Sequence, residues 1–168
     1  SPNVCMHTYP LPFALWAEKY ERGEHLATPS VRQVPSSCWP RELKCRSRMH
    51  YYLADQEAKQ SHSGARALLL DMDGHVTEAT TASLIVYRAE EGLVSPPAEK
   101  ILPGISAGLV QEMAGVLDIP FSHREMTVED VVHADEAFLA ATTACLLPVV
   151  RLNDSYLGHG QVGEVYRQ

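Results

Sequence analysis

The sequence predicts an α+β domain in which a mixed or antiparallel sheet is covered by outer helices. Two apolar patterns alternate along the chain. Short aliphatic runs are bounded by turn residues, as strands are, and longer stretches place apolar side chains at helical spacing. With 168 residues and 45% apolar content, the chain can bury one full core, so we expect one main domain.

The first elements are expected in the amino-terminal fifth of the chain. Residues 4–9 are strand-like, and residues 13–22 have apolar side chains near helical spacing before Gly23, which suits a helix C-terminus. Residues 31–34 are a second short strand candidate. The polar, proline-containing residues 35–40 then predict an irregular connection.

A helix is predicted within residues 42–60, where Met49, Tyr52 and Leu53 share one apolar face. Lys44 lies just before this helix. Taken alone, a single lysine is most often a solvated surface charge.

The central stretch is residues 68–86, which contain two apolar runs separated by Asp73 and Gly74. Asp-Gly between two such runs is typical of a β-hairpin, because glycine supplies the positive φ that the turn needs. Glu78 follows the turn and is expected just past the second strand. A carboxylate at a strand end is a candidate functional group.

Residues 102–106 form a predicted turn that leads into a helix over residues 107–117. Its predicted apolar side consists of Leu109, Val110, Met113, Val116 and Leu117. Backbone N–H groups at such a helix start, together with the Ser106 hydroxyl, suit an anion such as phosphate. The alternative is that Ser106 simply caps the helix.

The last third of the chain predicts a short helix and two strands. Thr127 and the acidic residues after it are typical of a helix start. Residues 137–141 and 146–152 are apolar strands on either side of Thr142 and Thr143. Threonines at such a turn are often no more than β-formers.

Composition and charge argue against several functions. The net charge of −7, with histidine neutral, disfavours a nucleic-acid partner. No apolar run is long enough to span a bilayer, so no membrane partner is expected. Four cysteines without a CxxC pair suit reduced thiols in the cytoplasm, and the eight histidines show no HExxH spacing, so no metal site is predicted.

Three fragments carry a resemblance to a known family: VTEATTASL from Val76, LPGIS from Leu102 and ADEAFLAATTACLLPV from Ala134. Their wording, order and spacing resemble the class IV pyridoxal-phosphate-dependent aminotransferases. This family includes branched-chain and D-amino acid aminotransferases and 4-amino-4-deoxychorismate lyase. The resemblance implies the C-terminal large domain of the D-amino acid aminotransferase-like fold, a barrel-like mixed sheet with outer helices.

The same resemblance implies a division of the chain. Residues 1–34 would be a remnant of the small N-terminal domain, most of which is absent here, and residues 35–41 the interdomain linker. Residues 42–168 would be the large cofactor-binding domain, with its C-terminal helix cut short after residues 162–167. The family's phosphate-binding arginine would lie in the absent N-terminal part.

The resemblance also implies roles for individual residues. Lys44, thirteen positions before Glu57, matches the lysine that holds pyridoxal 5′-phosphate as a Schiff base and acts in catalysis. Glu78 would pair with the pyridine nitrogen and keep it protonated. The phosphate would be held by four residues: Ile105, Ser106, Thr142 and Thr143.

The implied reaction is amino transfer between an amino acid and a 2-oxo acid, catalysed by a homodimer. The lyase of the same family is the alternative. Three positions depart from the family pattern: Ala79 replaces glycine, Ser83 replaces asparagine, and Arg48 stands where branched-chain enzymes have asparagine. The last departure argues against a branched-chain substrate and favours the lyase-like members.

Two alternative functions belong to other classes of protein. LLLDMDGHV resembles the DxDGT strand of haloacid dehalogenase-type phosphatases, in which Asp71 would be the nucleophile, Asp73 the acid-base and Mg²⁺ the cofactor. His75 replaces the expected threonine, and turn chemistry explains both aspartates more simply. The second rival is a non-catalytic module that keeps the cofactor-binding cup without the substrate domain.

Overall fold

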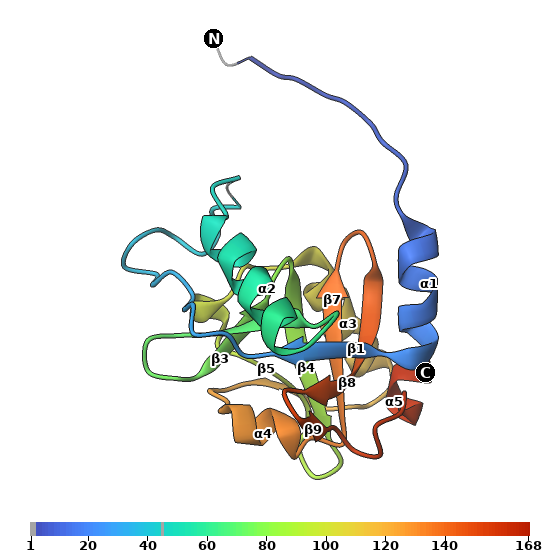
Figure 1. The fold of residues 1–168 in the computed structure, drawn as a ribbon. Helices are drawn as coiled ribbons and strands as arrows, with labels where there is room; N and C mark the ends of the chain where they lie inside the picture. Colours follow the sequence, from blue (N-terminus) through green and yellow to red (C-terminus); the bar gives the residue numbers. More distant parts are fainter. Residues whose placement is uncertain (1–2, 45) are drawn as a thin grey trace.

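The structure is a computed structural model that describes residues 3–44 and 46–168 (Figure 1). In these residues nine strands form one mixed sheet. The strands are β1 (Glu24–Ala27), β2 (Arg66–Leu70), β3 (Val76–Ala79), β4 (Ala82–Arg88), β5 (Gly92–Ser95), β6 (Phe121–His123), β7 (Glu136–Ala141), β8 (Cys145–Leu152) and β9 (Ser155–Tyr156).

The sheet closes into a barrel, as expected. Its order is β3-β2-β1-β8-β7-β4-β5-β6, and β9 pairs with β8. A further pairing of β3 with β4 closes the part of the sheet that runs from β3 to β4 in this order. β1 runs parallel to both β2 and β8, while the hairpins around it are antiparallel. The predicted α+β class with a mixed, barrel-like sheet is therefore confirmed.

Two hairpins share β3 and form the seam of the barrel. The predicted β2–β3 hairpin is confirmed, and Gly74 in its turn has φ 89°. β3 then pairs with β4 through Glu78 opposite Ser83 and Ala79 opposite Ala82. Glu78 thus lies inside a strand and not beyond it, because a second tight turn extends the sheet.

Aliphatic side chains from nearly every strand fill the barrel. At most 1% of each of the largest is exposed: Leu26, Leu68, Val76, Leu84, Leu139, Leu147 and Leu152. Removing such a side chain from water contributes about 1.5–3 kcal/mol. This core fixes the strand register, and the register places the functional side chains.

The helices lie outside the barrel (Figure 1). They are α1 (Phe13–Arg22), α2 (Met49–Ser61), the 3₁₀ turn η1 (Ala98–Lys100), α3 (Ile105–Val116), α4 (Val128–Val132) and α5 (Glu164–Arg167). Gly23 ends α1 at φ 79°, as predicted. Thr127 and Asp130 form a reciprocal capping box at the start of α4, which confirms the predicted short helix.

The two strands predicted in the amino-terminal fifth of the chain are wrong, and strand β1 was not predicted. Residues 4–9 are exposed and irregular, since no neighbouring strand pairs with them, and residues 31–34 form no strand. β1 begins with Glu24, a poor strand signal. Its carboxylate is only 2% exposed because Lys19 Nζ, at 2.8 Å, and Arg66, at 3.0 Å, neutralise it.

The helix over residues 42–60 is shorter than predicted, and its expected apolar face is exposed. Met49, Tyr52 and Leu53 are each at least half exposed, whereas Ala54 and Ala58 are fully buried against the barrel. Alanine lets the helix backbone approach the sheet closely. Hydrophobic periodicity favours the larger side chains and so selects the wrong face.

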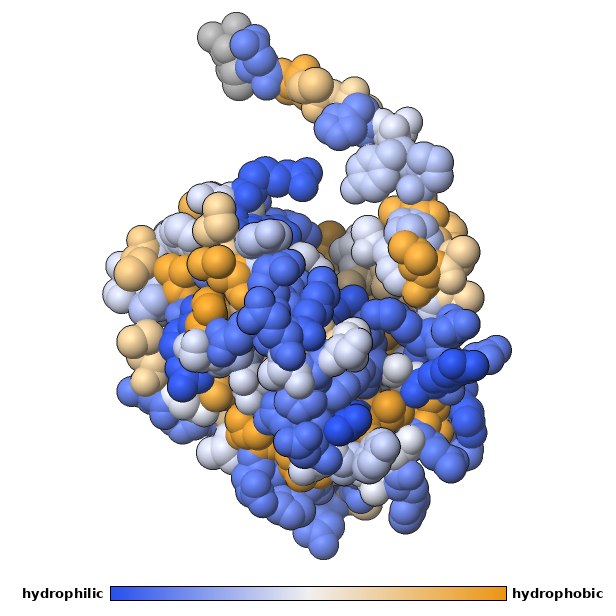
Figure 2. Space-filling model, in the orientation of Figure 1, coloured by the Kyte–Doolittle hydropathy of each residue, from blue (hydrophilic) through white to orange (hydrophobic). Residues whose placement is uncertain are grey.

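α3 repeats this pattern in part, although Val110 of its predicted face does pack against the core. It begins at Ile105, two residues earlier than predicted, and Leu109 and Val116 are 55% and 84% exposed while Ala114 is buried. α1 also leaves apolar side chains on the surface, and orange atoms gather over it in Figure 2. Within the described ranges, no helix combines the length and apolarity that crossing a membrane requires.

Candidate functional site

A cavity of about 330 Å³ lies where three connections of the barrel meet. These are the turn between β3 and β4, the turn between β7 and β8, and the loop that precedes α3. All six residues predicted to bind the cofactor line it: Lys44, Glu78, Ile105, Ser106, Thr142 and Thr143. Its volume is in the range of small-molecule sites.

Strand register brings two of these connections together. Glu78 of β3 is opposite Ser83 of β4, and Ser83 is in turn opposite Ala140 of β7. The Thr142–Thr143 turn begins two residues after Ala140. One row of paired residues therefore carries both the carboxylate and the threonine turn to the same end of the barrel.

Glu78 is 6% exposed and is held by neutral donors. Its Oε1 atom accepts hydrogen bonds from Gln33 Nε2 and Tyr51 Oη, both at 2.6 Å. Its Oε2 atom accepts one longer bond, from the backbone N–H of Leu102 at 3.3 Å. Burial and the adjacent Glu78 charge raise the pKa of Tyr51, so this phenol stays a donor.

The start of α3 offers backbone N–H groups to the cavity. Gly104 is the N-cap residue, no side chain caps the helix, and the first helical bond runs from Gly108 N to Gly104 O at 3.0 Å. The N–H groups of Ile105 and Ser106 come before that bond and point out of the helix. Ser106 is inside the first turn, so its reading as a simple N-cap is wrong.

Gly104 is also needed for close packing. A Cβ atom at this position would lie 3.0 Å from Ser83 Oγ, which is tighter than ordinary contact. The glycine thus lets the helix start rest against β4, beside Glu78. Ser83, where the family has asparagine, is small enough to permit this approach.

Lys44 and the two threonines complete the cavity wall. Lys44 is exposed, lies in the irregular segment before α2, and its backbone N–H donates to Glu42 O at 3.0 Å. Thr142 and Thr143 are exposed in the turn enclosed by the Ala141–Cys145 pair of β7 and β8. Lys44 and Glu78 therefore line one hollow from different segments.

These groups fit pyridoxal phosphate by their chemistry. A primary amine suits its aldehyde, a buried carboxylate in the cavity wall suits a ring nitrogen, and an uncapped helix start with hydroxyls nearby suits a phosphate. This fit is judged from the amine, carboxylate, N–H and hydroxyl groups that the described residues offer.

Sequence reasoning missed several residues in and beside the cavity. Tyr51 lies seven positions after Lys44, in the first turn of α2, and this closeness in sequence could have pointed to it. Gln33 gave no signal, because it lies in a segment that was assigned to a strand. Tyr9 also lines the cavity, from the extended amino-terminal segment.

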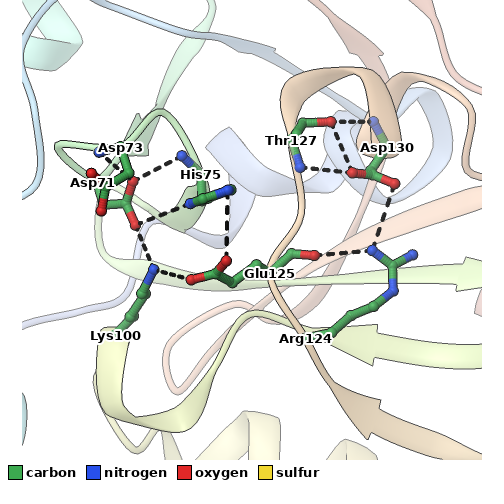
Figure 3. Close-up of polar contacts among 8 residues, drawn as sticks. All are labelled: Asp71, Asp73, His75, Lys100, Arg124, Glu125, Thr127 and Asp130. Carbon is green, nitrogen blue, oxygen red and sulfur yellow. Dashed lines mark hydrogen bonds and ion pairs between the residues drawn. The ribbon is translucent and has the colours of Figure 1, made fainter.

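The paired aspartates of the phosphatase reading serve the hairpin turn instead (Figure 3). Asp71 Oδ1 accepts hydrogen bonds from the backbone N–H of Asp73 at 3.0 Å and of His75 at 2.8 Å, and Lys100 Nζ lies 2.8 Å from Oδ2. Burial favours a higher pKa for Asp71, but the bonds from Lys100 and His75 outweigh it and lower that pKa. Lys100 also pairs with Glu125. Both oxygens of the Asp71 carboxylate are thus used in these structural contacts, which disfavours a phosphatase in which Asp71 is the nucleophile.

Known proteins share both sequence and fold with this chain. A probable branched-chain-amino-acid aminotransferase of Thermotoga maritima is 32% identical over 147 residues, which cover 86% of this chain and 52% of the relative. D-alanine aminotransferase of Bacillus licheniformis is 24% identical over 164 residues, with 97% and 55% covered. The chain spans about half the length of the curated relatives it matches.

A solved structure gives the same result. The branched-chain amino acid aminotransferase of Thermobaculum terrenum, in its PLP-form, superimposes with a TM-score of 0.79 at 26% identity, covering 86% of this chain and 47% of that one. The family model described as amino-transferase class IV matches residues 1–152. The barrel, the shared cavity and this match over nine-tenths of the sequence establish that the chain belongs to the class IV aminotransferase family.

Proposed function

We propose that this chain forms the pyridoxal-phosphate site of an enzyme that transfers an amino group between an amino acid and a 2-oxo acid. One observation carries the proposal: Lys44, Glu78 and the uncapped start of α3 line a single cavity. The Thermobaculum terrenum relative, which was solved in its PLP-form, supports the same cofactor.

When bound, pyridoxal phosphate withdraws electrons from the substrate and so acidifies its α-carbon. Lys44 Nζ would hold the cofactor covalently and, once released, would accept and return the α-proton. Glu78 would keep a proton on the ring nitrogen. The phosphate would be held by the N–H groups of Ile105 and Ser106 and by the hydroxyls of Thr142 and Thr143.

The lyase of the same family is the second candidate, because Arg48 lines the cavity at the position where branched-chain enzymes have asparagine. Release of pyruvate from aminodeoxychorismate would identify the lyase. Transfer of an amino group to 2-oxoglutarate would identify the transaminase. Both assays use the same purified protein.

Two further features of the whole protein belong to this proposal. The homodimer that the resemblance implies stays a prediction, to be tested by light scattering. The cytoplasmic location also stays a prediction, supported by free thiols at Cys5, Cys38 and Cys145. Cys45 lies outside the described residues.

The test of the proposed function is Lys44→Ala. Without the amine, the visible absorption of the bound cofactor should disappear and turnover should fall by at least about 100-fold. Absorption spectra and initial rates measure this. Lys59→Ala, on an exposed part of α2, is the matched control and should leave both unchanged. Full activity in Lys44→Ala would reject the assignment, and a natural protein without a visible band would indicate a non-catalytic module.

A further inference from the structure

We infer that Gln33 and Tyr51 are positioning residues that orient Glu78 and hold it as an anion, with His50 supporting Gln33 from behind. The inference rests on the proposed function, since it concerns how Glu78 acts on the cofactor's ring nitrogen. Neither residue was part of any motif in the sequence. Their role follows from the contacts within and beside the cavity.

The two donors bind the same oxygen of Glu78. Gln33 Nε2 and Tyr51 Oη both lie 2.6 Å from Oε1, whereas among the described residues Oε2 accepts the 3.3 Å bond from Leu102 N and no other. Two short bonds to one oxygen fix the rotation of the carboxylate. Oε2 is therefore the oxygen left to accept a hydrogen bond from a ring nitrogen in the cavity.

The Gln33 amide is itself held in one orientation. A carboxylate only accepts, so the amide nitrogen must face Glu78 and the amide oxygen must face away. That oxygen accepts from the N–H of Val34 at 3.2 Å and lies 3.0 Å from His50 Nε2. His50 must then carry its hydrogen on Nε2. Gln33 is 3% exposed, and its backbone N–H donates to Leu70 O at 2.9 Å.

The surroundings keep this network neutral. Burial, followed by the nearby charges of Arg41 and Arg48, lowers the pKa of His50, so its imidazole supports Gln33 without adding a charge. The raised pKa of Tyr51 keeps the phenol protonated. Hydrogen bonds stabilise an anion over its neutral acid. Because the donors are neutral, the negative charge of Glu78 remains available to the ring nitrogen.

This arrangement decides how well Glu78 can hold a proton on the ring nitrogen. Without the two donors the carboxylate could rotate, and its Oε2 atom would lose its alignment with that nitrogen. With the donors in place the alignment is kept. Gln33 and Tyr51 thus act on the ring nitrogen through Glu78 and need no contact with substrate.

The test compares Gln33→Leu and Tyr51→Phe with the natural protein, each loaded with pyridoxal phosphate labelled with ¹⁵N in the ring. The ¹⁵N chemical shift distinguishes a protonated from an unprotonated ring nitrogen during a pH titration. Loss of one donor should lower the pH at which this nitrogen loses its proton by about one pH unit. The kcat should fall while KM changes little.

Thr80→Val is the matched structural control. Its hydroxyl is buried and donates to Asp55 Oδ1 at 2.8 Å, yet it makes no contact with Glu78. It should lower stability without moving the ¹⁵N titration. If Gln33→Leu does not fold, Tyr51→Phe carries the test, because it removes a single hydroxyl.

The outcomes separate this inference from the proposed function. A titration in Tyr51→Phe identical to that of the natural protein would overturn the inference, while bound cofactor would still support the enzyme. A natural protein that takes up no labelled cofactor would overturn the proposed function itself. An equal shift in Thr80→Val would also overturn the inference, since general loosening would then explain the change.

Discussion

Glu78 connects the sheet to the chemistry at the scale of a single residue. Its backbone forms part of the barrel seam, while its side chain ends in the cavity. The sequence motifs could identify this carboxylate and the five other cavity residues, because each lies in a short stretch of distinctive wording. They could not identify Gln33 and Tyr51. Those residues lie 45 and 27 positions from Glu78, and only the fold brings them together.

Glu78→Gln should slow proton abstraction by about 100-fold while the cofactor still binds. The amide can accept the bonds from Gln33 and Tyr51, but it carries no charge to hold a proton on the ring nitrogen. The phosphate contacts proposed for the start of α3 are separate from this position. Stopped-flow absorbance with an α-deuterated and an unlabelled amino acid would measure the step. Complete loss of cofactor binding would contradict the role given to Glu78.

At the scale of the element, buried charge and small side chains explain why prediction failed for some segments. β1 was missed because its first residue, Glu24, is a buried charge. The predicted faces of α2 and, in part, α3 were wrong because alanines make much of the contact with the barrel. α4 was predicted well, since its capping box lies within four residues of sequence. Local signals were reliable, whereas signals that depend on a distant partner were not.

The η1 turn gives a prediction with a defined pH dependence. The pKa of Asp71 is lower in the folded protein than its usual value of 3.8, so its pairing with Lys100 stabilises the fold above that pH. This contribution is lost as the pH falls below 3.8 and Asp71 takes up a proton. Lys100→Met should therefore lower the free energy of unfolding by about 1 kcal/mol at pH 7.

Urea titrations of Lys100→Met and the natural protein at several pH values would measure this. The difference in stability should be constant between pH 5 and 8, roughly, and should vanish in acid. Lys59→Met, which removes an exposed lysine of α2, should show little difference at any pH. A Lys100→Met deficit that persisted unchanged in acid would exclude the ion pair as its source.

At the scale of the whole molecule, the barrel interior determines stability. Leu84 of β4 is fully buried in the main core cluster, between the seam with β3 and the long pairing with β7. The α+β class could be expected from the alternating apolar patterns, and the barrel from the resemblance. The closing pair of strands could not, because the register of Glu78 against Ser83 appears nowhere in the composition or periodicity of the chain.

Leu84→Ala should lower the free energy of unfolding by about 2–5 kcal/mol, because it leaves a cavity that the closed barrel cannot collapse to fill. Urea unfolding followed by circular dichroism measures the change. Leu109→Ala is the control, since that side chain is 55% exposed on α3 and its truncation should cost at most about 0.5 kcal/mol. Equal losses in both variants would contradict the assignment of the core.

The seam between β3 and β4 consists of two residue pairs, and one of them contains Glu78. Under the proposed function, a chain in which β3 and β4 have not paired has an incomplete binding site. A vitamin B6 coenzyme that binds only the paired form would increase the population of that form. The yellow colour of a preparation would then report how many molecules had completed folding.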